Sequence, residues 1–145
     1  MQRTALFPGS FNPFTVGHAD IVRRALQLFD KVIVAIGVNS AKDPADNTKR
    51  IARLRNLYAD NPRVEVIAYD SLTADLVRQK NASCIIRGIR NEADLAYENE
   101  IAQVNFSLFG IETVYLLADP ELRELSSTVV RELQRFGKDI SQLLP

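Results

Sequence analysis

The stretch from Pro8 to His18 holds the residue types in this sequence that are best suited to chemistry. It places two glycines, two prolines and the chain's only histidine directly after a short apolar strand predicted over 4–7. Glycines let a backbone approach a ligand closely, and a helix N-terminus offers unpaired N–H groups and the positive end of its dipole. A helix is predicted to begin at about Gly17, so the stretch is suited to holding phosphate. A tight turn beside a surface histidine would give the same spacing.

A second group of candidate residues is the segment 87–90. Arg87 ends a run of apolar residues, Gly88 permits a tight turn, and Arg90 follows on the same loop. Two planar guanidiniums on one loop can each bind phosphate oxygens in a bidentate manner. The alternative is that both arginines lie on the surface and pair with Glu92 and Asp94.

Composition excludes several other kinds of site. The chain has one cysteine, Cys84, and one histidine, which rules out an internal disulfide and makes a Cys/His zinc site untenable. Its 18 basic and 18 acidic residues balance, so no overall positive field favours nucleic acid. The N-terminus shows no signal-peptide pattern, and no apolar run is long enough to span a membrane. We therefore expect a soluble, cytoplasmic protein that binds neither nucleic acid nor membranes.

Apolar segments that alternate with helical patterns predict the fold. Strands are predicted at 4–7, 32–38, 64–68, 84–87 and 113–117, and helices at about 17–29, 49–58, 71–79, 92–108 and 126–136. Ser71 is expected to cap the third helix, and a final amphipathic turn or helix is expected to end at Leu144. The sequence predicts an α/β, Rossmann-like doubly wound sheet of five parallel strands with helices on both faces. A single domain is expected over residues 1–145.

In such sheets, ligands bind outside the carboxyl ends of the strands, where the winding reverses. The segments that follow the strands there are 8–18, 39–42, 87–90 and 118–127, and three of them carry cations or helix-capping hydroxyls. Lys42 on its own would be interpreted as a solvated lysine. On the long helix, the residues predicted to face the core are Tyr97, Ile101, Val104 and Leu108. Glu98 lies off that stripe and is expected to face solvent or to bind a sugar hydroxyl.

Together, these motifs resemble the (H/T)xGH nucleotidyltransferase superfamily and, within it, the phosphopantetheine adenylyltransferase family. The signature itself falls on 15–18 (TVGH), and it is shared with nicotinate-nucleotide and cytidylyl transferases. The motifs that narrow the resemblance are Lys42, 86–90 (IRGIR), 97–105 (YENEIAQVN) and 126–132 (SSTVVRE). This combination is far more specific, and it extends over nearly the whole chain.

The resemblance implies transfer of adenylate from ATP to 4′-phosphopantetheine, which gives dephospho-coenzyme A and pyrophosphate, with Mg²⁺ as cofactor. The catalytic residues that it implies are Ser10, His18, Lys42 and Arg90. The residues that it implies for phosphopantetheine are Ser10, Lys42, Thr73 and Arg87. Those that it implies for ATP are Ser10, Phe11, His18, Gly88, Ile89, Arg90, Glu98, Leu122, Arg123, Glu124, Leu125, Ser126, Ser127 and Thr128. No side chain is assigned to the metal, because Asn12 stands where many members of the family carry Asp.

The implied chemistry agrees with the residue types that the sequence lacks. The nucleophile would be a phosphate oxygen, which is largely ionised near neutral pH because its second pKa is about 6. No general base is then required, so neither an Asp–His pair nor a nucleophilic cysteine is needed. Catalysis would depend on in-line positioning and on charges aimed at the phosphorus.

Two other functions compete with this interpretation. A nicotinate-mononucleotide adenylyltransferase shares the signature and also the pair Asn12-Pro13. A non-catalytic ATP-binding module of the stress-protein kind could use the same sheet. Such a module usually carries a GxxG pattern with a later glycine after its fourth strand, and this sequence lacks that pattern.

The resemblance also implies a homohexamer built from two trimers, with coenzyme A as a candidate feedback ligand. Phe106 and Phe109 lie outside the predicted core stripe, and the connection 109–111 is unusually apolar for a surface loop. Exposed apolar patches of this kind tend to mark interfaces. The alternative is that these residues merely close the end of the core.

Overall fold

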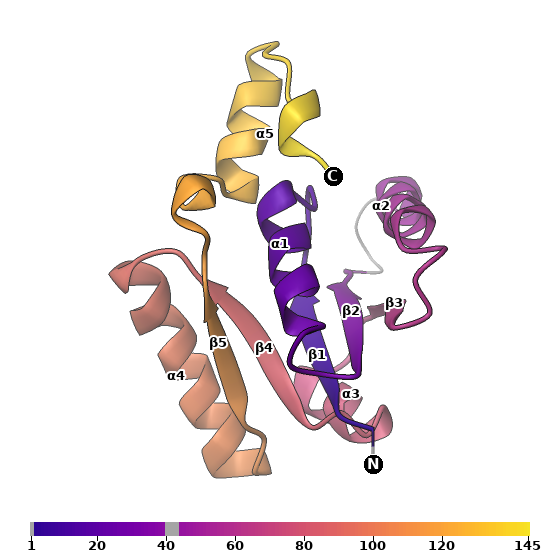
Figure 1. The fold of residues 1–145 in the computed structure, drawn as a ribbon, viewed down its shortest axis with the longest axis vertical. Coiled ribbons are helices and arrows are strands. Elements are labelled where there is room, and N and C mark those ends of the chain that lie inside the picture. The colour runs from indigo at the N-terminus through magenta and orange to yellow at the C-terminus, as the bar shows by residue number, and fades with distance from the viewer. Residues whose placement is uncertain (1, 40–43) are drawn as a thin grey trace.

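The computed structural model describes residues 2–39 and 44–145. Within these ranges, five parallel strands form one sheet in the order β3-β2-β1-β4-β5 (Figure 1). The strands are β1 (Thr4–Gly9), β2 (Lys31–Gly37), β3 (Val64–Tyr69), β4 (Cys84–Ile89) and β5 (Thr113–Leu117). The predicted five-stranded parallel sheet is therefore confirmed.

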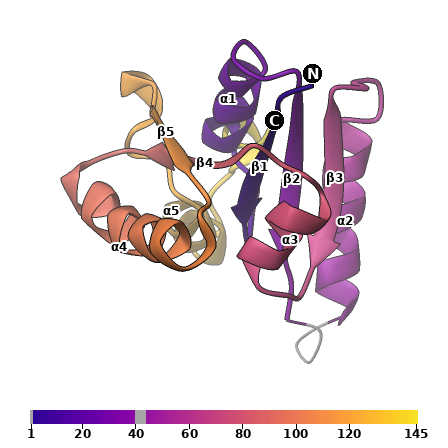
Figure 2. The same cartoon turned by 90° about the horizontal axis from the view of Figure 1, so that it is seen from below.

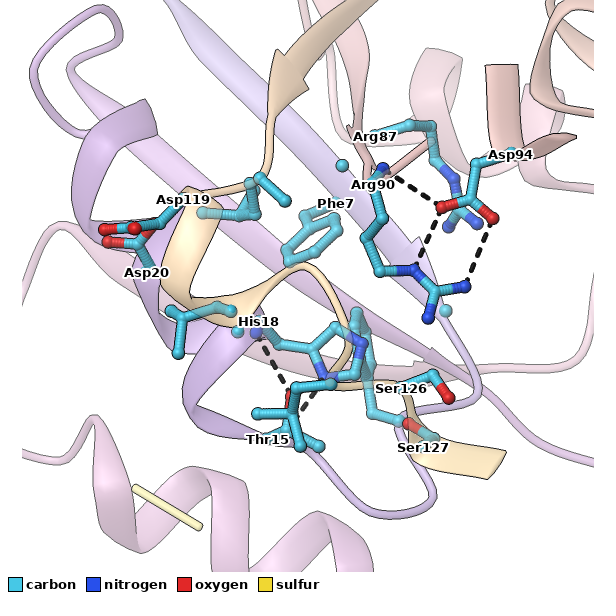
Figure 3. Close-up of a pocket in the computed structure, with 18 of the residues that line it drawn as sticks. Phe7, Thr15, His18, Asp20, Arg87, Arg90, Asp94, Asp119, Ser126 and Ser127 are labelled. Carbon is cyan, nitrogen blue, oxygen red and sulfur yellow. Dashed lines mark hydrogen bonds and ion pairs between the residues drawn. The ribbon is translucent and has the colours of Figure 1, made fainter. Parts of the chain in front are cut away.

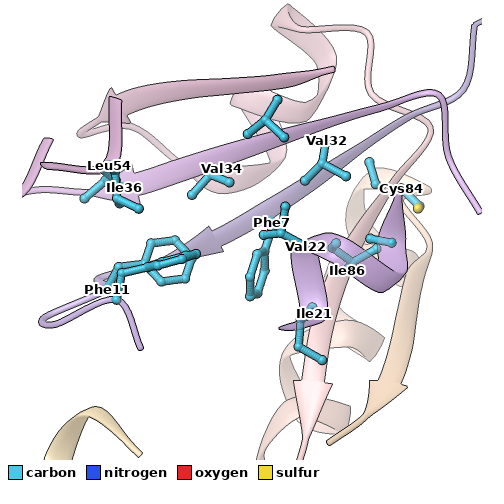
Figure 4. Close-up of a cluster of buried hydrophobic side chains, with 14 residues drawn as sticks. Phe7, Phe11, Ile21, Val22, Val32, Val34, Ile36, Leu54, Cys84 and Ile86 are labelled. Atoms are coloured by element: carbon cyan, nitrogen blue, oxygen red, sulfur yellow. The ribbon is translucent and has the colours of Figure 1, made fainter. Parts of the chain in front are cut away.

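Helices cover both faces of this sheet, as predicted (Figure 2). They are α1 (Val16–Ala25), α2 (Pro44–Leu57), α3 (Thr73–Gln79), α4 (Glu92–Phe109) and α5 (Ser127–Arg135), with 3₁₀ turns η1 (Pro120–Leu122) and η2 (Ser141–Leu143). Successive residues of a strand point to opposite faces. Phe7 and Val34 accordingly pack with α1 and α2 (Figure 4), whereas Leu6 and Ile33 pack with α3. None of the described helices is both long and apolar enough to cross a membrane.

Three helices begin or end at residues other than those predicted. α1 ends at Ala25 rather than near Phe29, and the side chain of Arg63 donates hydrogen bonds to carbonyls just beyond its end. α2 begins at Pro44, because proline is well tolerated in the first turn of a helix. The residue before α3 is Leu72, which makes no side-chain capping bond, so the predicted cap at Ser71 is wrong.

The orientation predicted for α4 is also wrong. The stripe expected in the core is exposed, with Tyr97 at 64% and Leu108 at 70%, whereas Glu98 is only 8% exposed. Helical spacing identifies an apolar stripe, but it does not show whether that stripe faces the sheet. The side of α4 that faces the sheet carries Glu98, which forms an ion pair with Arg87 of β4. The apolar stripe of α4 is left uncovered.

The sheet opens between β1, its central strand, and β4. β1 pairs with β2 along its whole length, but it pairs with β4 only at Ala5↔Cys84 and Leu6↔Ile85. β1 lies between β2 and β4, so the order of winding reverses here. Ligands of doubly wound sheets bind at such a point. The separation of β1 and β4 beyond Leu6 therefore makes room for a site at their carboxyl ends.

Candidate active site at the carboxyl ends of β1 and β4

A cavity of about 280 Å³ lies where β1 and β4 separate (Figure 3). Its walls come from the β1–α1 loop, the β4–α4 turn, the first turns of α4 and the segment from β5 to α5. The predicted site residues that line it are Ser10, Phe11, His18, Arg87, Gly88, Arg90, Glu98, Leu122, Leu125, Ser126, Ser127 and Thr128. The structure thus brings most of the predicted phosphate-binding residues to one place.

The remaining predicted residues do not line this cavity. Ile89 is buried in the sheet, and Arg123 and Glu124 are exposed on the turn before α5. The hydroxyl of Thr73 lies 2.9 Å from that of Tyr69, at the end of β3. Lys42 lies outside the described residues.

The β1–α1 loop is shaped by an aromatic cluster. A Cβ atom on Gly9 would lie 2.9 Å from the ring of Phe11, so only glycine fits beneath this ring. Phe11 has a φ of 47°, and its ring packs against Phe7, Phe14 and His18 with centroid distances of 5.1–5.2 Å. The ring is 4% exposed and belongs to the core. Phe11 therefore helps to hold the imidazole of His18 in place.

The N-terminus of α1 fixes the tautomer of His18. Thr15 caps the helix: its hydroxyl accepts a hydrogen bond from the backbone N–H of His18. The backbone N–H of Thr15 in turn donates to Nδ1 of His18 over 3.0 Å. Because Nδ1 accepts this bond, the proton of a neutral imidazole resides on Nε2. The site therefore holds His18 as an Nε2–H donor.

The surroundings of His18 keep its imidazole neutral. Burial, and to a smaller extent the positive charges of Arg87 and Arg90, lower its pKa from 6.5 to about 4. At neutral pH the ring is thus an uncharged hydrogen-bond donor. Donors that are oriented in advance can stabilise charge that develops on a phosphate in a transition state.

The lowered pKa of His18 predicts that acid destabilises the fold. The unfolded chain binds a proton near pH 6.5 and the folded chain only near pH 4, so the free energy of unfolding falls as the pH drops between these values. The expected loss from this residue between about pH 7 and pH 5 is roughly 2 kcal/mol. Urea denaturation of the wild type and of His18→Ala at both pH values measures it. The variant should lack this part of the loss, and equal losses in both proteins would contradict the assignment.

Carboxylates of α4 hold both arginines of the β4–α4 turn. Arg87 forms two hydrogen bonds with Glu98, over 2.6 and 2.8 Å, and a further one with the carbonyl of Pro8. Arg90 forms two with Asp94, over 2.9 and 3.1 Å (Figure 3). The alternative pairing of Arg90 with Asp94 is thus present, but Arg87 pairs with Glu98 rather than with Glu92. Both guanidiniums nevertheless line the cavity.

The segment before α5 closes the cavity opposite the arginines. Ser126 caps α5 through a bond from the N–H of Val129. Ser127 donates a hydrogen bond of 2.8 Å to the carbonyl of Pro13. Arg123 donates one of 3.0 Å to the carbonyl of Arg90. The N-terminal end of α5 is therefore tied to both the β1–α1 loop and the β4–α4 turn, and its positive dipole end borders the cavity.

Sequence reasoning missed several residues that support or line the site. Asp20 and Asp119 line the cavity. The side chains of Arg50 and Arg131 donate to the carbonyls of Ser10 and Asn12, respectively, and so hold the loop from outside. These arginines are distant in sequence from the loop, and no local pattern could have revealed them.

The described residues do not form a metal site of their own. They contain no group of three acidic, histidine or cysteine side chains placed to hold a cation. Both oxygens of Asp20 accept hydrogen bonds from Arg23 and Arg24, and one oxygen of Asp119 accepts the N–H of Glu121. Because these carboxylates already accept hydrogen bonds from the protein, they do not form a site that would hold a cation with protein side chains alone.

Comparison with known proteins agrees with the family resemblance that the sequence motifs indicate. The cytidylyltransferase-like family matches residues 6–133. The chain is 51% identical to the phosphopantetheine adenylyltransferase of Phocaeicola vulgatus and 50% identical to that of Bacteroides thetaiotaomicron, and each alignment covers 99% of this chain and 96% of the relative. The one from Porphyromonas gingivalis is 49% identical, over 99% and 95% of the two chains.

One solved structure supports the fold. A crystal structure of NadR protein in complex with NR superposes with a TM-score of 0.60 at 19% identity. The alignment covers 91% of this chain but only 40% of that longer one. At this level of identity the likeness concerns the fold alone.

Proposed function

This chain belongs to the phosphopantetheine adenylyltransferases of the cytidylyltransferase-like family, and from that premise we propose how its cavity carries out the reaction. The enzyme transfers AMP from ATP to 4′-phosphopantetheine in coenzyme A biosynthesis, and it releases pyrophosphate. The observation that carries the proposal is the convergence of neutral His18, Arg87, Arg90 and the N-terminal end of α5 on one cavity. All four are donors suited to phosphate.

The two substrates meet at the point where β1 and β4 separate. ATP lies along the β4–α4 turn and the segment 122–128, with Arg90 on its phosphates. The acceptor approaches from the opposite side, with its phosphate on Arg87. Ser10, just after the end of β1, is exposed, and we place it between the two substrates. Thr73 would bind the acceptor outside the cavity proper, and Lys42 is a further candidate ligand of the acceptor.

The reaction proceeds by in-line attack without a protein base. The phosphate of 4′-phosphopantetheine is mostly ionised at neutral pH, because its second pKa is about 6. Its oxygen attacks the α-phosphorus of ATP, and pyrophosphate leaves on the opposite side. The Nε2–H of His18 donates to the α-phosphate as charge builds up there, and Arg90 stabilises the same charge. A neutral histidine serves this role because donating a hydrogen bond requires no proton transfer.

Magnesium would enter with the nucleotide. Mg²⁺ keeps much of its water and commonly binds through substrate phosphates and one or two carboxylates. The carboxylates that line this cavity are engaged by arginines or by a backbone N–H. We therefore assign the metal to the triphosphate and to no side chain of this protein.

The acceptor specificity can be tested by pyrophosphate release. The purified enzyme is mixed with ATP and with either 4′-phosphopantetheine or nicotinate mononucleotide. We expect pyrophosphate only with 4′-phosphopantetheine. Release with nicotinate mononucleotide alone would favour the other adenylyltransferase function, and release with neither would contradict the enzyme assignment.

Assembly into a homohexamer of two trimers is a further part of the proposal. α4 exposes an apolar side that includes Tyr97, Ile101 and Leu108. A second copy of the chain that covers this side would remove it from water, at a gain of about 25 cal/mol per Å² of apolar surface.

Coenzyme A shares the pantetheine arm of the acceptor, and we propose that it competes for the same site. We also place the enzyme in the cytoplasm, where its substrate ATP is abundant.

Sedimentation equilibrium at low micromolar concentration tests the assembly. Obligate interfaces typically bury more than about 2,000 Å², so the subunits should stay associated at this dilution. Leu108→Glu places a charge on the exposed apolar side of α4 and should dissociate the assembly. A wild-type species at the monomer mass of 16.3 kDa would refute the oligomer. A stable trimer would refute only the stacking of two trimers.

A further inference from the structure

Two carboxylates of α4 each hold one of the arginines that line the cavity. Asp94 and Glu98 lie one helical turn apart, so they project from the same side of the helix. Each accepts two hydrogen bonds from a single guanidinium. Both pairs form part of the cavity wall. The β4–α4 unit thus presents two arginines whose positions are fixed before any substrate arrives.

The pair at Glu98 is the more buried of the two. One of its oxygens accepts from Nε of Arg87 over 2.8 Å, and the other accepts from Nη2 over 2.6 Å. The side chain of Glu98 is 9% exposed and that of Arg87 is 30% exposed. The carbonyl of Pro8 accepts a third bond, from Nη1. Arg87 is therefore held by α4 on one side and by β1 on the other.

This arrangement leaves donors of the Arg87 guanidinium for a ligand. A guanidinium has five N–H donors, and partners among the described residues take three of them. Glu98 covers the edge formed by Nε and Nη2. One N–H on Nη1 and one on Nη2 remain, and each can donate a charge-assisted hydrogen bond to a phosphate oxygen.

Arg90 repeats the same geometry with Asp94. Its Nε and Nη2 donate to the two oxygens of Asp94, so its terminal edge is also left for a ligand. The backbone N–H of Arg90 donates to the same carboxylate over 3.0 Å. The N–H of Asp94 is bound in turn by the side chain of Asn91, the cap of α4. Asp94 is thus fixed by the start of the helix.

We propose that Glu98 and Asp94 are positioning residues that act on different substrates, Glu98 through Arg87 and Asp94 through Arg90. The inference rests on the proposed function, in which Arg87 binds the acceptor phosphate and Arg90 binds ATP. It adds to the expected contact between Glu98 and ATP, because each carboxylate oxygen of Glu98 keeps acceptor capacity beyond its hydrogen bond from Arg87. Holding a long side chain in place beforehand removes an entropic cost that substrate binding would otherwise bear.

Conservative variants test the inference. Glu98→Gln and Asp94→Asn keep the size of the side chain but remove its charge and one acceptor oxygen. Dissociation constants for ATP and for 4′-phosphopantetheine are measured by calorimetry, and KM and kcat are measured for both substrates. We expect Glu98→Gln to weaken 4′-phosphopantetheine at least tenfold, and Asp94→Asn to weaken ATP at least tenfold and 4′-phosphopantetheine less than twofold. Glu92→Gln, an exposed position on the same helix, should change neither.

Double variants separate positioning from direct contact. If Glu98 positions Arg87, then Arg87→Ala and Arg87→Ala/Glu98→Gln should bind 4′-phosphopantetheine with the same affinity as each other. The double variant also leaves no unpaired charge at this buried position, so it can still be measured if Arg87→Ala unfolds. A further loss of 4′-phosphopantetheine affinity when Glu98→Gln is added to Arg87→Ala would overturn the inference.

The outcome also separates this inference from the proposed function. If Arg87→Ala weakens ATP instead of the acceptor, the division of substrates is wrong. The inference still holds in that case, provided that Glu98→Gln weakens the same ligand as Arg87→Ala. If Glu98→Gln follows neither arginine, the inference fails while the division of substrates stands.

Discussion

His18→Ala is expected to lower kcat by about 10²–10³, which corresponds to roughly 3–4 kcal/mol of lost transition-state stabilisation. The reason is that the variant removes the Nε2–H donor that the bond from Thr15 holds in place. The binding of either substrate alone should change much less, because this donor acts on charge that builds up during the transfer. Rapid-quench or steady-state assays with both substrates at saturation measure the loss.

The same substitution also affects stability, and a control must separate the two effects. His18 provides the acceptor for the N–H of Thr15 and packs against Phe11 and Phe14, so its loss should cost about 1 kcal/mol or more of folding free energy. Arg63→Ala is the matched control, because it removes bonds to the carbonyls beyond the opposite end of α1. This control should lower stability and leave kcat unchanged. A folded His18→Ala enzyme with near wild-type turnover would contradict the catalytic role.

The second large effect is expected from the two arginines. Arg87→Ala should weaken 4′-phosphopantetheine by about 10–100-fold and ATP far less, because a lost charge-assisted hydrogen bond costs about 1.5–3 kcal/mol. Arg90→Ala should instead weaken ATP or lower kcat. We expect the two arginines to bind different substrates because Arg87 lies within β4 and contacts β1, whereas Arg90 lies beyond the strand, next to the segment before α5. Calorimetric titration of each variant with each substrate measures the difference.

Removal of Arg87 leaves Glu98 without its partner, so stability must be followed in parallel. A buried carboxylate that loses its partner typically destabilises a protein by about 3–5 kcal/mol, and the partial exposure of Arg87 reduces this figure here. Affinities are therefore compared at a temperature at which each variant is shown to be folded by circular dichroism. Equal losses of both ligands in both variants would show that the two arginines do not divide the substrates.

The sheet could be predicted from the sequence because its strands are short, mostly apolar segments that alternate with helical patterns. The apolar run from Val32 to Ile36 is typical of a strand that is covered on both faces, and all of these residues are buried. The orientation of α4 could not be predicted in the same way. Its apolar stripe is exposed, and the side that faces the sheet carries Glu98, which pairs with Arg87 of another element. Helical spacing alone does not contain that information.

The candidate site was predictable only where its residues follow a strand. Arg90 lies directly after β4, and His18 lies in the first turn of the helix that follows β1. The carboxyl ends of these strands meet at the switch point. The residues that hold the site are of a different kind. Arg50 and Arg131 reach the β1–α1 loop from α2 and α5 through bonds to backbone carbonyls, which any residue type can provide. Their partners therefore leave no trace in the sequence.

The pH dependence of kcat/KM for 4′-phosphopantetheine, measured in the wild type and in His18→Ala, tests the central claim most directly. In the proposed mechanism, the substrate phosphate is the ionising nucleophile and His18 is a neutral donor, with a pKa lowered to about 4. The rate is therefore expected to rise through an apparent pKa of about 6, the second ionisation of the phosphate, in both proteins. His18→Ala should lower the plateau by about 10²–10³ without moving this ionisation. An ionisation near neutrality that disappears in His18→Ala would show that the histidine titrates as a base, and would contradict the account.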